Sequence, residues 1–180
     1  TVLSSNATGV KGAIARWAFS VGKQSHEYRL AGKPLPGVLG VQYKIADKLV
    51  FSKLRERLGG RMKFMVSGSA KLNAKVQGWF YSAGLIIIEG SGLTETTAVS
   101  FVNVPTRPKF GTVGQSLPGT EVQIAADGEV LLRGPGVMRG YHDADDHTDE
   151  AIVDGWFHTG DVGHLDDEGN LSLTDRKKDL

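Results

Sequence analysis

Residues 89–95 place glycines, a hydroxyl and a carboxylate directly after an apolar run, a combination that could bind a phosphate group and its metal ion. Thr94 offers a hydroxyl for a phosphate oxygen, and Glu95 offers a carboxylate of the kind that holds Mg²⁺. The run at 85–88 predicts a short strand buried on both faces. We expect it to stop at Glu89 and to pass into a sharp turn at 90–92, where glycines let a ligand approach the backbone. A turn and a solvated Thr-Glu pair without a ligand is the alternative.

A βαβ unit is expected to place these residues at the edge of a sheet. Residues 62–66 predict a first strand, 72–83 a helix and 85–88 the second strand, which together should be right-handed and parallel. The carboxyl ends of both strands then face one edge, where ligands bind in open α/β sheets. The small-residue turns at 68–70 and 90–92 could form a slot for a flat base, or their glycines could simply end the strands.

The first third of the chain is predicted to be helical and is strongly basic. Apolar residues recur at helical spacing over 7–31 and again over 42–58, and a Pro-Gly loop at 33–37 separates the two. Residues 1–63 hold 12 Lys and Arg against three acids, whereas the rest of the chain is acidic. The basic residues could be solvated helix faces, or they could contact an anionic membrane surface. Nucleic acid is not an expected partner, because no recognition motif accompanies the charge.

The second half reads as short strands and tight turns that follow a Pro-containing connector at 103–111. Ala126-Asp127-Gly128 predicts one hairpin, and the polar turn at 166–170 predicts another. Together they indicate a small distorted β-barrel. The Gly-rich segment at 111–114 is expected to approach the substrate, and the segment at 134–141 is interpreted as structural.

Composition excludes several kinds of site. The chain has no Cys, so a thiolate nucleophile, a disulfide and a Cys-ligated metal are excluded, and its five His show no metal-binding spacing. No apolar run reaches the roughly 18 residues of a membrane span. These features favour a cytoplasmic protein, with peripheral membrane contact as a further option. The start of the sequence has neither an initiator Met nor a signal-peptide pattern, so we expect a piece from within a longer protein.

Four ordered motifs resemble those of the adenylate-forming, AMP-binding enzymes, which include acyl-CoA synthetases, luciferase and peptide-synthetase adenylation domains. Gly92-Leu93-Thr94-Glu95 is similar to the Tyr-Gly-x-Thr-Glu motif of the family. The acyl-CoA synthetase segment at 134–141, the Trp-Phe-x-Thr-Gly-Asp motif at 156–161 and Asp-Arg-Lys-Lys-Asp at 175–179 follow in the order of the family. The strongest similarity is to long-chain fatty acyl-CoA synthetases.

The resemblance implies an α/β fold: a partial α/β subdomain of an AMP-binding N-terminal domain at 1–105, which includes the βαβ unit, and a small distorted β-barrel subdomain at 106–175. Residues 176–180 would be a hinge to a C-terminal domain. The implied reaction converts a fatty acid and ATP into an acyl-adenylate, which CoA then converts into acyl-CoA. The implied cofactors are ATP/AMP and Mg²⁺, with CoA as co-substrate and the remaining N- and C-terminal parts of the same protein as partners.

The resemblance also implies roles for individual residues. Asp161 would accept hydrogen bonds from both ribose hydroxyls, although a lone Asp in a turn is usually solvated, and Arg176 would reach the same ribose. Lys178 would be the hinge, although a charged terminal tail is the alternative reading. Thr94 and Glu95 are the catalytic candidates, Glu95 as the Mg²⁺ ligand. The nucleotide-binding candidates are Gly68, Ser69, Ala70, Glu89, Gly90, Ser91, Gly92, Thr94, Asp161 and Arg176.

Three features depart from the family pattern. Ser91 stands where an aromatic residue usually stacks on adenine, the Ser/Thr/Gly-rich phosphate loop is absent, and the C-terminal catalytic Lys would lie beyond residue 180. We therefore expect the fragment alone to be inactive. Alternative functions are a different adenylating enzyme such as an aryl-CoA ligase, a non-catalytic nucleotide-binding module, or a plain interaction domain with a basic membrane-facing surface.

Overall fold

A computed structural model describes residues 9–68, 70 and 72–177, so the candidates Ser69 and Lys178 lie outside the described residues. The contacts of the chain divide it into two compact units. The first comprises Thr1–Met65, Leu72–Ile87 and Pro105–Phe110, and the second comprises Val66–Lys71, Ile88–Val104 and Gly111–Leu180. The boundaries predicted after residues 105 and 175 remain predictions.

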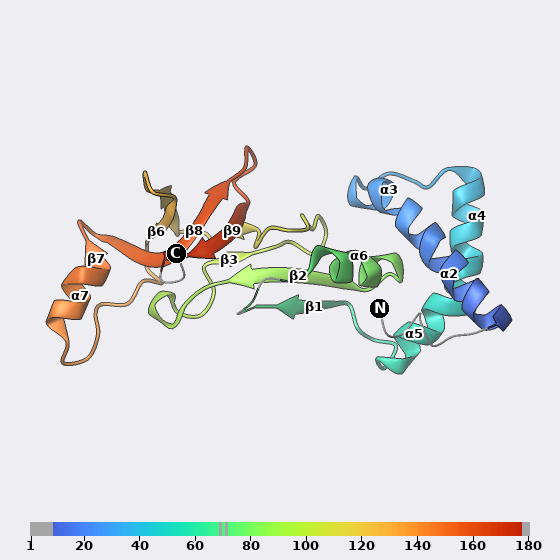
Figure 1. Ribbon diagram of the computed structural model, residues 1–180, viewed down its shortest axis with the longest axis horizontal. Helices are drawn as coiled ribbons and strands as arrows, with labels where there is room; N and C mark the ends of the chain where they lie inside the picture. The colour runs from blue at the N-terminus through green and yellow to red at the C-terminus, as the bar shows by residue number, and fades with distance from the viewer. Residues whose placement is uncertain (1–8, 69, 71, 178–180) are drawn as a thin grey trace. The chain divides into compact units, whose positions relative to one another are not determined.

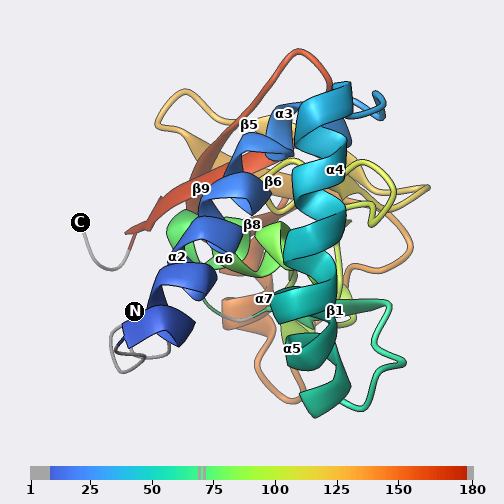
Figure 2. The ribbon, with the colours of Figure 1, turned by 90° about the vertical axis from the view of Figure 1, so that its right-hand side faces the viewer.

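The first unit is built mainly from helices (Figure 1). They are α2 (Gly9–Gln24), α3 (His26–Leu30), α4 (Gly37–Ala46), the π-helical turn η1 (Asp47–Phe51), α5 (Ser52–Arg57) and α6 (Ala74–Ser82). Figure 2 shows α2 and α4 side by side, which agrees with their mutual contacts. The predicted helix over 42–58 in fact begins at Gly37, because Pro36 caps its first turn with a φ of −54° and needs no N–H there.

The core of this unit lies between α2, the α4–η1 segment and the end of α6. Its fully buried residues include Ala18, Val21 and Phe51. Phe19 stacks on Trp79 with 4.6 Å between ring centroids. Two of the apolar residues at helical spacing in the first helix, Ile14 and Trp17, lie outside this core and are 37% and 36% exposed.

His26 makes the stability of this unit depend on pH. Its Nε2 lies 2.8 Å from Ser82 Oγ, and burial, together with the charges of Arg29 and Lys23, lowers its pKa from 6.5 to about 4. Because the unfolded chain binds this proton more readily, the stabilisation is present above pH 6.5 and is lost as the pH falls toward 4. The ring is only half buried, so solvent screening reduces the expected loss of unfolding free energy to about 1 kcal/mol.

Urea unfolding at pH 7 and pH 5 measures this effect. The variant His26→Gln should lose less stability than the wild type between the two pH values. The exposed His147→Gln should behave as the wild type does. Equal pH dependence in wild type and His26→Gln would contradict the assignment.

A four-stranded sheet carries the predicted glycine-rich stretch. Its order is β1 (Phe64–Ser67), β2 (Ile86–Ser91), β3 (Phe101–Val102) and β4 (Gln115–Ser116), and the arrows of β1 and β2 point the same way in Figure 1, with α6 between them in the chain. The βαβ unit is thus present, and Ile87, Ile88 and Glu89 are consecutively buried, as a strand covered on both faces requires.

One expectation for this stretch was wrong. β2 does not stop at Glu89 but continues to Ser91, because Gly90 pairs with Val102 and Ser91 pairs with Phe101 in antiparallel register. This pairing supplies hydrogen-bond partners that a local turn would have lacked.

The second unit also contains an antiparallel sheet that curls into half of a barrel, as the predicted fold class requires. Its elements are β5 (Glu121–Ile124), β6 (Glu129–Arg133), β7 (Ile152–Val153), β8 (Trp156–Leu165) and β9 (Leu171–Arg176), with the short helix α7 (Asp145–Ala151) before β7. Both predicted hairpins are confirmed: β5 pairs with β6, and β8 pairs with β9. Asp161 lies inside the long strand β8 and not at a strand end, because β6 and β9 pair with β8 on both sides of that position.

No helix within residues 9–68, 70 and 72–177 combines the length and the apolar character that crossing a bilayer requires.

Candidate functional site

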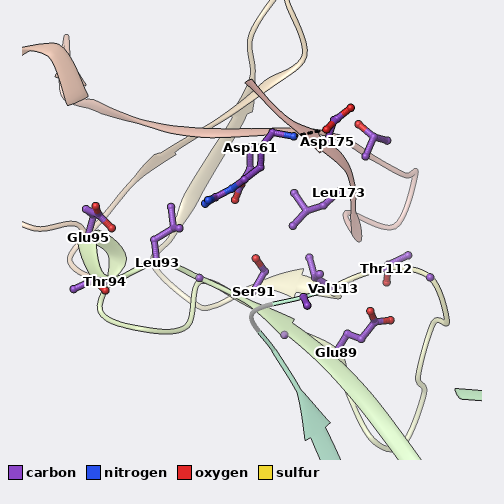
Figure 3. Close-up of a pocket in the computed structure, with 16 residues that line it drawn as sticks. Glu89, Ser91, Leu93, Thr94, Glu95, Thr112, Val113, Asp161, Leu173 and Asp175 are labelled. Atoms are coloured by element: carbon purple, nitrogen blue, oxygen red, sulfur yellow. Dashed lines mark hydrogen bonds and ion pairs between the residues drawn. The ribbon is translucent and has the colours of Figure 1, made fainter. Parts of the chain in front are cut away.

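The second unit contains a cavity of about 590 Å³, a size typical of small-molecule sites. Figure 3 shows Thr94 and Glu95 at one end, Glu89 and Thr112 at the other, and Asp161 and Leu173 across from Ser91. The walls come from the end of β2 and the following turn, the loop at 111–113, β8 and β9. Segments far apart in the sequence therefore form one hollow.

Most of the predicted site residues line this cavity. They are Ala70, Glu89, Gly90, Ser91, Gly92, Thr94, Glu95, Asp161 and Arg176. Gly68 is not among the lining residues. From the 111–114 segment, which was predicted to approach the substrate, Gly111, Thr112 and Val113 line the cavity.

Asp161 and Arg176 form an ion pair on the wall made by β8 and β9. They are direct cross-strand partners, and Arg176 Nε donates to Asp161 Oδ1 over 2.8 Å. The Asp161 side chain is 15% exposed and that of Arg176 is 57% exposed. Thr159 holds the backbone here, because its hydroxyl accepts from the Asp161 N–H at 3.1 Å and donates to the Val130 carbonyl at 2.7 Å. A carboxylate fixed in this way can accept hydrogen bonds from a diol.

The turn that carries Thr94 and Glu95 is a single 3₁₀ turn, η2 (Thr94–Thr96). Buried Thr96 closes it: its hydroxyl accepts from the Leu93 N–H at 3.0 Å and lies 3.2 Å from the Leu93 carbonyl as a donor. Thr97 and Ala98 then adopt left-handed φ values of 58° and 72°. Such conformations in residues other than glycine cost energy and persist where neighbouring contacts fix them, which is common at functional sites.

Position 92 must be a glycine because another backbone segment of the same chain packs directly against it. A Cβ atom at this position would lie 2.1 Å from the Ala98 carbonyl oxygen and 2.8 Å from Val99 Cα. The chain after η2 folds back against Gly92, so this glycine permits a chain crossing, whereas the sequence suggested only an approach by a ligand.

We expect Gly92→Ala to destabilise the second unit by about 2 kcal/mol, the usual scale of overpacking, and to deform the cavity. Urea unfolding compares it with Gly37→Ala, a glycine with no atom within 4 Å of the added Cβ. Equal stability of the two variants would contradict this account.

Sequence reasoning did not single out the apolar part of the wall. Leu93, Val113 and Leu173 line the cavity with Ser91, and Thr174 and Asp175 complete the β9 side. The sequence holds one weak indication of this wall, because Leu173 lies two residues before Asp175 and alternate residues of a strand share a face. The pairing of β9 with β8 then places that face at the cavity. An apolar wall beside Ser91 offers a flat base a surface without an aromatic side chain.

A buried carboxylate supports the end of β9. Glu129 is 4% exposed and accepts from Lys177 Nζ at 2.7 Å and from the Gly160 N–H at 2.9 Å, and His158 Nδ1 lies 3.0 Å away. Lys177 Nζ also lies 2.6 Å from Asp127. Burial alone would raise the pKa of Glu129, but the hydrogen bonds from Lys177, His158 and Gly160 outweigh burial and lower that pKa. The anionic form of Glu129 therefore holds the strand that presents Arg176.

Comparison with known proteins identifies the family. The model of the AMP-binding enzymes matches residues 21–142. The chain belongs to the AMP-binding enzyme family. The long-chain-fatty-acid–CoA ligase FadD15 of Mycobacterium bovis is 44% identical over 146 residues, which cover 81% of this chain and 24% of that protein. Long chain acyl-CoA synthetase 4 of Arabidopsis thaliana is 36% identical over 74% of this chain and 22% of its own length.

Solved structures show the same fold. The anthranilate CoA ligase AuaEII in complex with anthranoyl-AMP superposes with a TM-score of 0.60 and 26% identity over 65% of this chain and 25% of that one. Among the curated sequence relatives, the chain spans between 22% and 29% of the relative's own length. The predicted family and fold class are confirmed.

A metal ion at this site would need ligands beyond protein side chains. The described part of the chain contains no group of three or more His, Asp or Glu side chains placed to hold a metal ion. Glu95 lies at one end of the cavity as a half-buried carboxylate. One carboxylate suits Mg²⁺ when phosphate oxygens and water supply the remaining ligands, so the residues present fit a magnesium–nucleotide complex.

Proposed function

We propose that this chain carries the AMP-, ribose- and magnesium-binding part of an ATP-dependent acyl-CoA synthetase. In the first step the acid attacks the α-phosphorus of ATP and releases pyrophosphate, and in the second the CoA thiol attacks the acyl-adenylate and releases AMP. The observation that carries the proposal is the Asp161–Arg176 pair, which faces the Thr94–Glu95 turn across one cavity. Membership of the AMP-binding family supports it.

In this proposal each wall of the cavity has a separate task. Asp161 accepts hydrogen bonds from the ribose hydroxyls, and Arg176 fixes that carboxylate from the neighbouring strand. Thr94 donates to the α-phosphate. Residues Gly90, Ser91 and Gly92 form the polar side of the base slot, with Ala70 and Glu89 beside them, while Val113 and Leu173 cover the opposite face of the base.

Glu95 would hold Mg²⁺. The ion supplies charge neutralisation at the phosphates when bound. The contribution of this chain is to keep a carboxylate at the phosphate end of the cavity, away from Asp161, so that the two carboxylates serve different parts of the nucleotide. Lys178 remains our proposed hinge to a C-terminal domain that brings further residues and CoA to the same site.

The proposed acid is a long-chain fatty acid, because the sequence relatives carry that specificity in their names. ATP–pyrophosphate exchange by the full-length protein, measured with fatty, aryl and amino acids, tests this. Exchange that depends on long-chain fatty acids supports the proposal. Exchange with aryl or amino acids only would assign a different adenylating enzyme. Nucleotide binding without exchange for any acid would indicate a non-catalytic module.

A surface on the first unit favours peripheral membrane contact by an otherwise cytoplasmic protein. On α4 and η1, Val38, Val41, Ile45 and Leu49 follow helical spacing and are 76%, 59%, 46% and 45% exposed. Exposed Lys44 and Lys48 lie along the same helix. An apolar stripe beside lysines is the pattern of a helix that lies on an anionic bilayer.

Flotation of the full-length protein with vesicles of anionic or neutral lipid tests this contact. We expect binding to the anionic vesicles only and its loss in the double variant Lys44→Glu/Lys48→Glu. The matched double variant Lys63→Glu/Lys75→Glu reverses the same charge elsewhere and should retain binding. No binding by the wild type would refute the proposed membrane contact.

A further inference from the structure

The segment at 134–141, interpreted from sequence as structural, contacts the turn that carries the two catalytic candidates. The Met138 N–H donates to the Glu95 carbonyl at 2.7 Å, and the Thr97 hydroxyl donates to the Gly136 carbonyl at 2.7 Å. The Tyr141 hydroxyl donates to Glu95 Oε1 at 2.9 Å. The first bond holds the backbone of η2, the second holds the side chain of the residue that follows η2, and the third reaches the carboxylate itself.

Tyr141 is itself held in place. Its N–H donates to Thr148 Oγ1 at 2.8 Å, and that hydroxyl lies 3.1 Å from the Ala144 carbonyl, to which it donates. Gly140 packs so closely on Thr148 that an added Cβ would lie 2.9 Å from Thr148 Cγ2. The phenol therefore points at Glu95 from a backbone that helix α7 fixes.

The donor suits a carboxylate that must keep its charge. Tyr141 donates a phenolic hydroxyl to Glu95, and a phenol is uncharged near neutral pH. A neutral donor fixes one oxygen of Glu95 and leaves its negative charge in place. A lysine or arginine at the same position would neutralise that charge. The carboxylate thus remains available to a cation through its other oxygen.

We propose that Tyr141 is a positioning residue: it fixes the Glu95 carboxylate in the orientation that receives the magnesium–nucleotide complex. This inference rests on the proposed function, because it assigns a task to Glu95 at the phosphate end of the cavity. It adds to that site a residue from the 134–141 segment, Tyr141, which lies 46 positions after Glu95 in the sequence.

The test uses the full-length protein and the variants Tyr141→Phe and Tyr28→Phe. Tyr141→Phe removes one hydroxyl and keeps the ring, and Tyr28→Phe makes the same change in α3. Two readouts are the Mg²⁺ concentration that half-saturates pyrophosphate exchange and the affinity for Mn²⁺, measured by electron paramagnetic resonance with a non-hydrolysable ATP analogue. Alkyl-adenylate binding, which needs no metal, is measured in parallel.

For Tyr141→Phe we expect about a tenfold higher half-saturating Mg²⁺ concentration and weaker Mn²⁺ binding, in line with the loss of one hydrogen bond to a charged group. Saturating Mg²⁺ should restore most of the exchange rate, adenylate affinity should stay unchanged, and Tyr28→Phe should match the wild type.

Two results would overturn the assignment of Tyr141 alone. One is unchanged metal dependence in Tyr141→Phe, and the other is a lower rate at every Mg²⁺ concentration with unchanged Mn²⁺ affinity, which a merely structural role would produce. A wild-type protein that binds neither adenylate nor the ATP analogue would instead refute the proposed function, and the role of Tyr141 with it.

Discussion

Replacing Asp161 by Ala should weaken binding of a non-hydrolysable alkyl-adenylate by about 100-fold, because two hydrogen bonds from ribose hydroxyls to a charged acceptor are lost at about 1.5 kcal/mol or more each. The change also removes the 2.8 Å hydrogen bond that Arg176 Nε donates to Asp161 Oδ1. Both losses occur on the same wall of the cavity.

Isothermal titration calorimetry on the full-length protein measures this effect. Asp167→Ala is the matched control, since Asp167 is an exposed residue in the turn that follows β8. It should leave adenylate affinity unchanged. An Asp161→Ala protein that is folded and binds adenylate as tightly as the wild type would place the ribose elsewhere and remove the main support for the proposed function.

The second large effect is on stability. Glu129→Gln should destabilise the second unit by about 3 kcal/mol, because the buried carboxylate loses the charge that strengthens its hydrogen bonds with Lys177, His158 and the Gly160 N–H. The variant keeps the size of the side chain but loses the charge that attracts Lys177 and His158. The end of β9 should loosen, so adenylate affinity should fall as well, through displacement of Arg176.

Glu121→Gln provides the control for this effect. Glu121 also pairs with an arginine, Arg133, but its side chain is 57% exposed, and an exposed pair contributes about 1 kcal/mol or less. Urea unfolding at pH 7 should therefore separate the two variants clearly. Equal losses of stability would show that burial of Glu129 adds nothing.

The pH dependence of the Glu129 effect has a definite sign. Because the folded state lowers the pKa of Glu129 from 4.5, its ionised form stabilises the fold above that pH, and the stabilisation is lost as the pH falls below it. The stability difference between wild type and Glu129→Gln should therefore shrink when unfolding is repeated in acid. A constant difference would mean that the charge of Glu129 is not what stabilises β9.

The sequence alone determined the features that depend on local chemistry. Asp-Gly at 127–128 specified a hairpin because a glycine adopts the left-handed turn conformation easily, and its φ is +86°. The apolar run before Glu89 specified a buried strand. The ordered motifs identified the family and the side chains Thr94, Glu95, Asp161 and Arg176, all of which line one cavity.

The tertiary structure alone decided what depends on partners distant in the chain. β2 extends through Gly90 and Ser91 because β3 offers backbone partners there, and a strand's end is set by its neighbour more than by its own residues. Gly92 is fixed by the carbonyl of Ala98, which no motif reveals.

The same holds for the residues that support the site. Glu129 meets Lys177 across 48 positions of sequence, and Tyr141 meets Glu95 across 46. Short motifs record the groups that would touch a nucleotide, because those types and spacings follow from the chemistry of the ligand. The groups that hold them in place are set by the packing of strands and turns, because any donor brought to the right distance could serve.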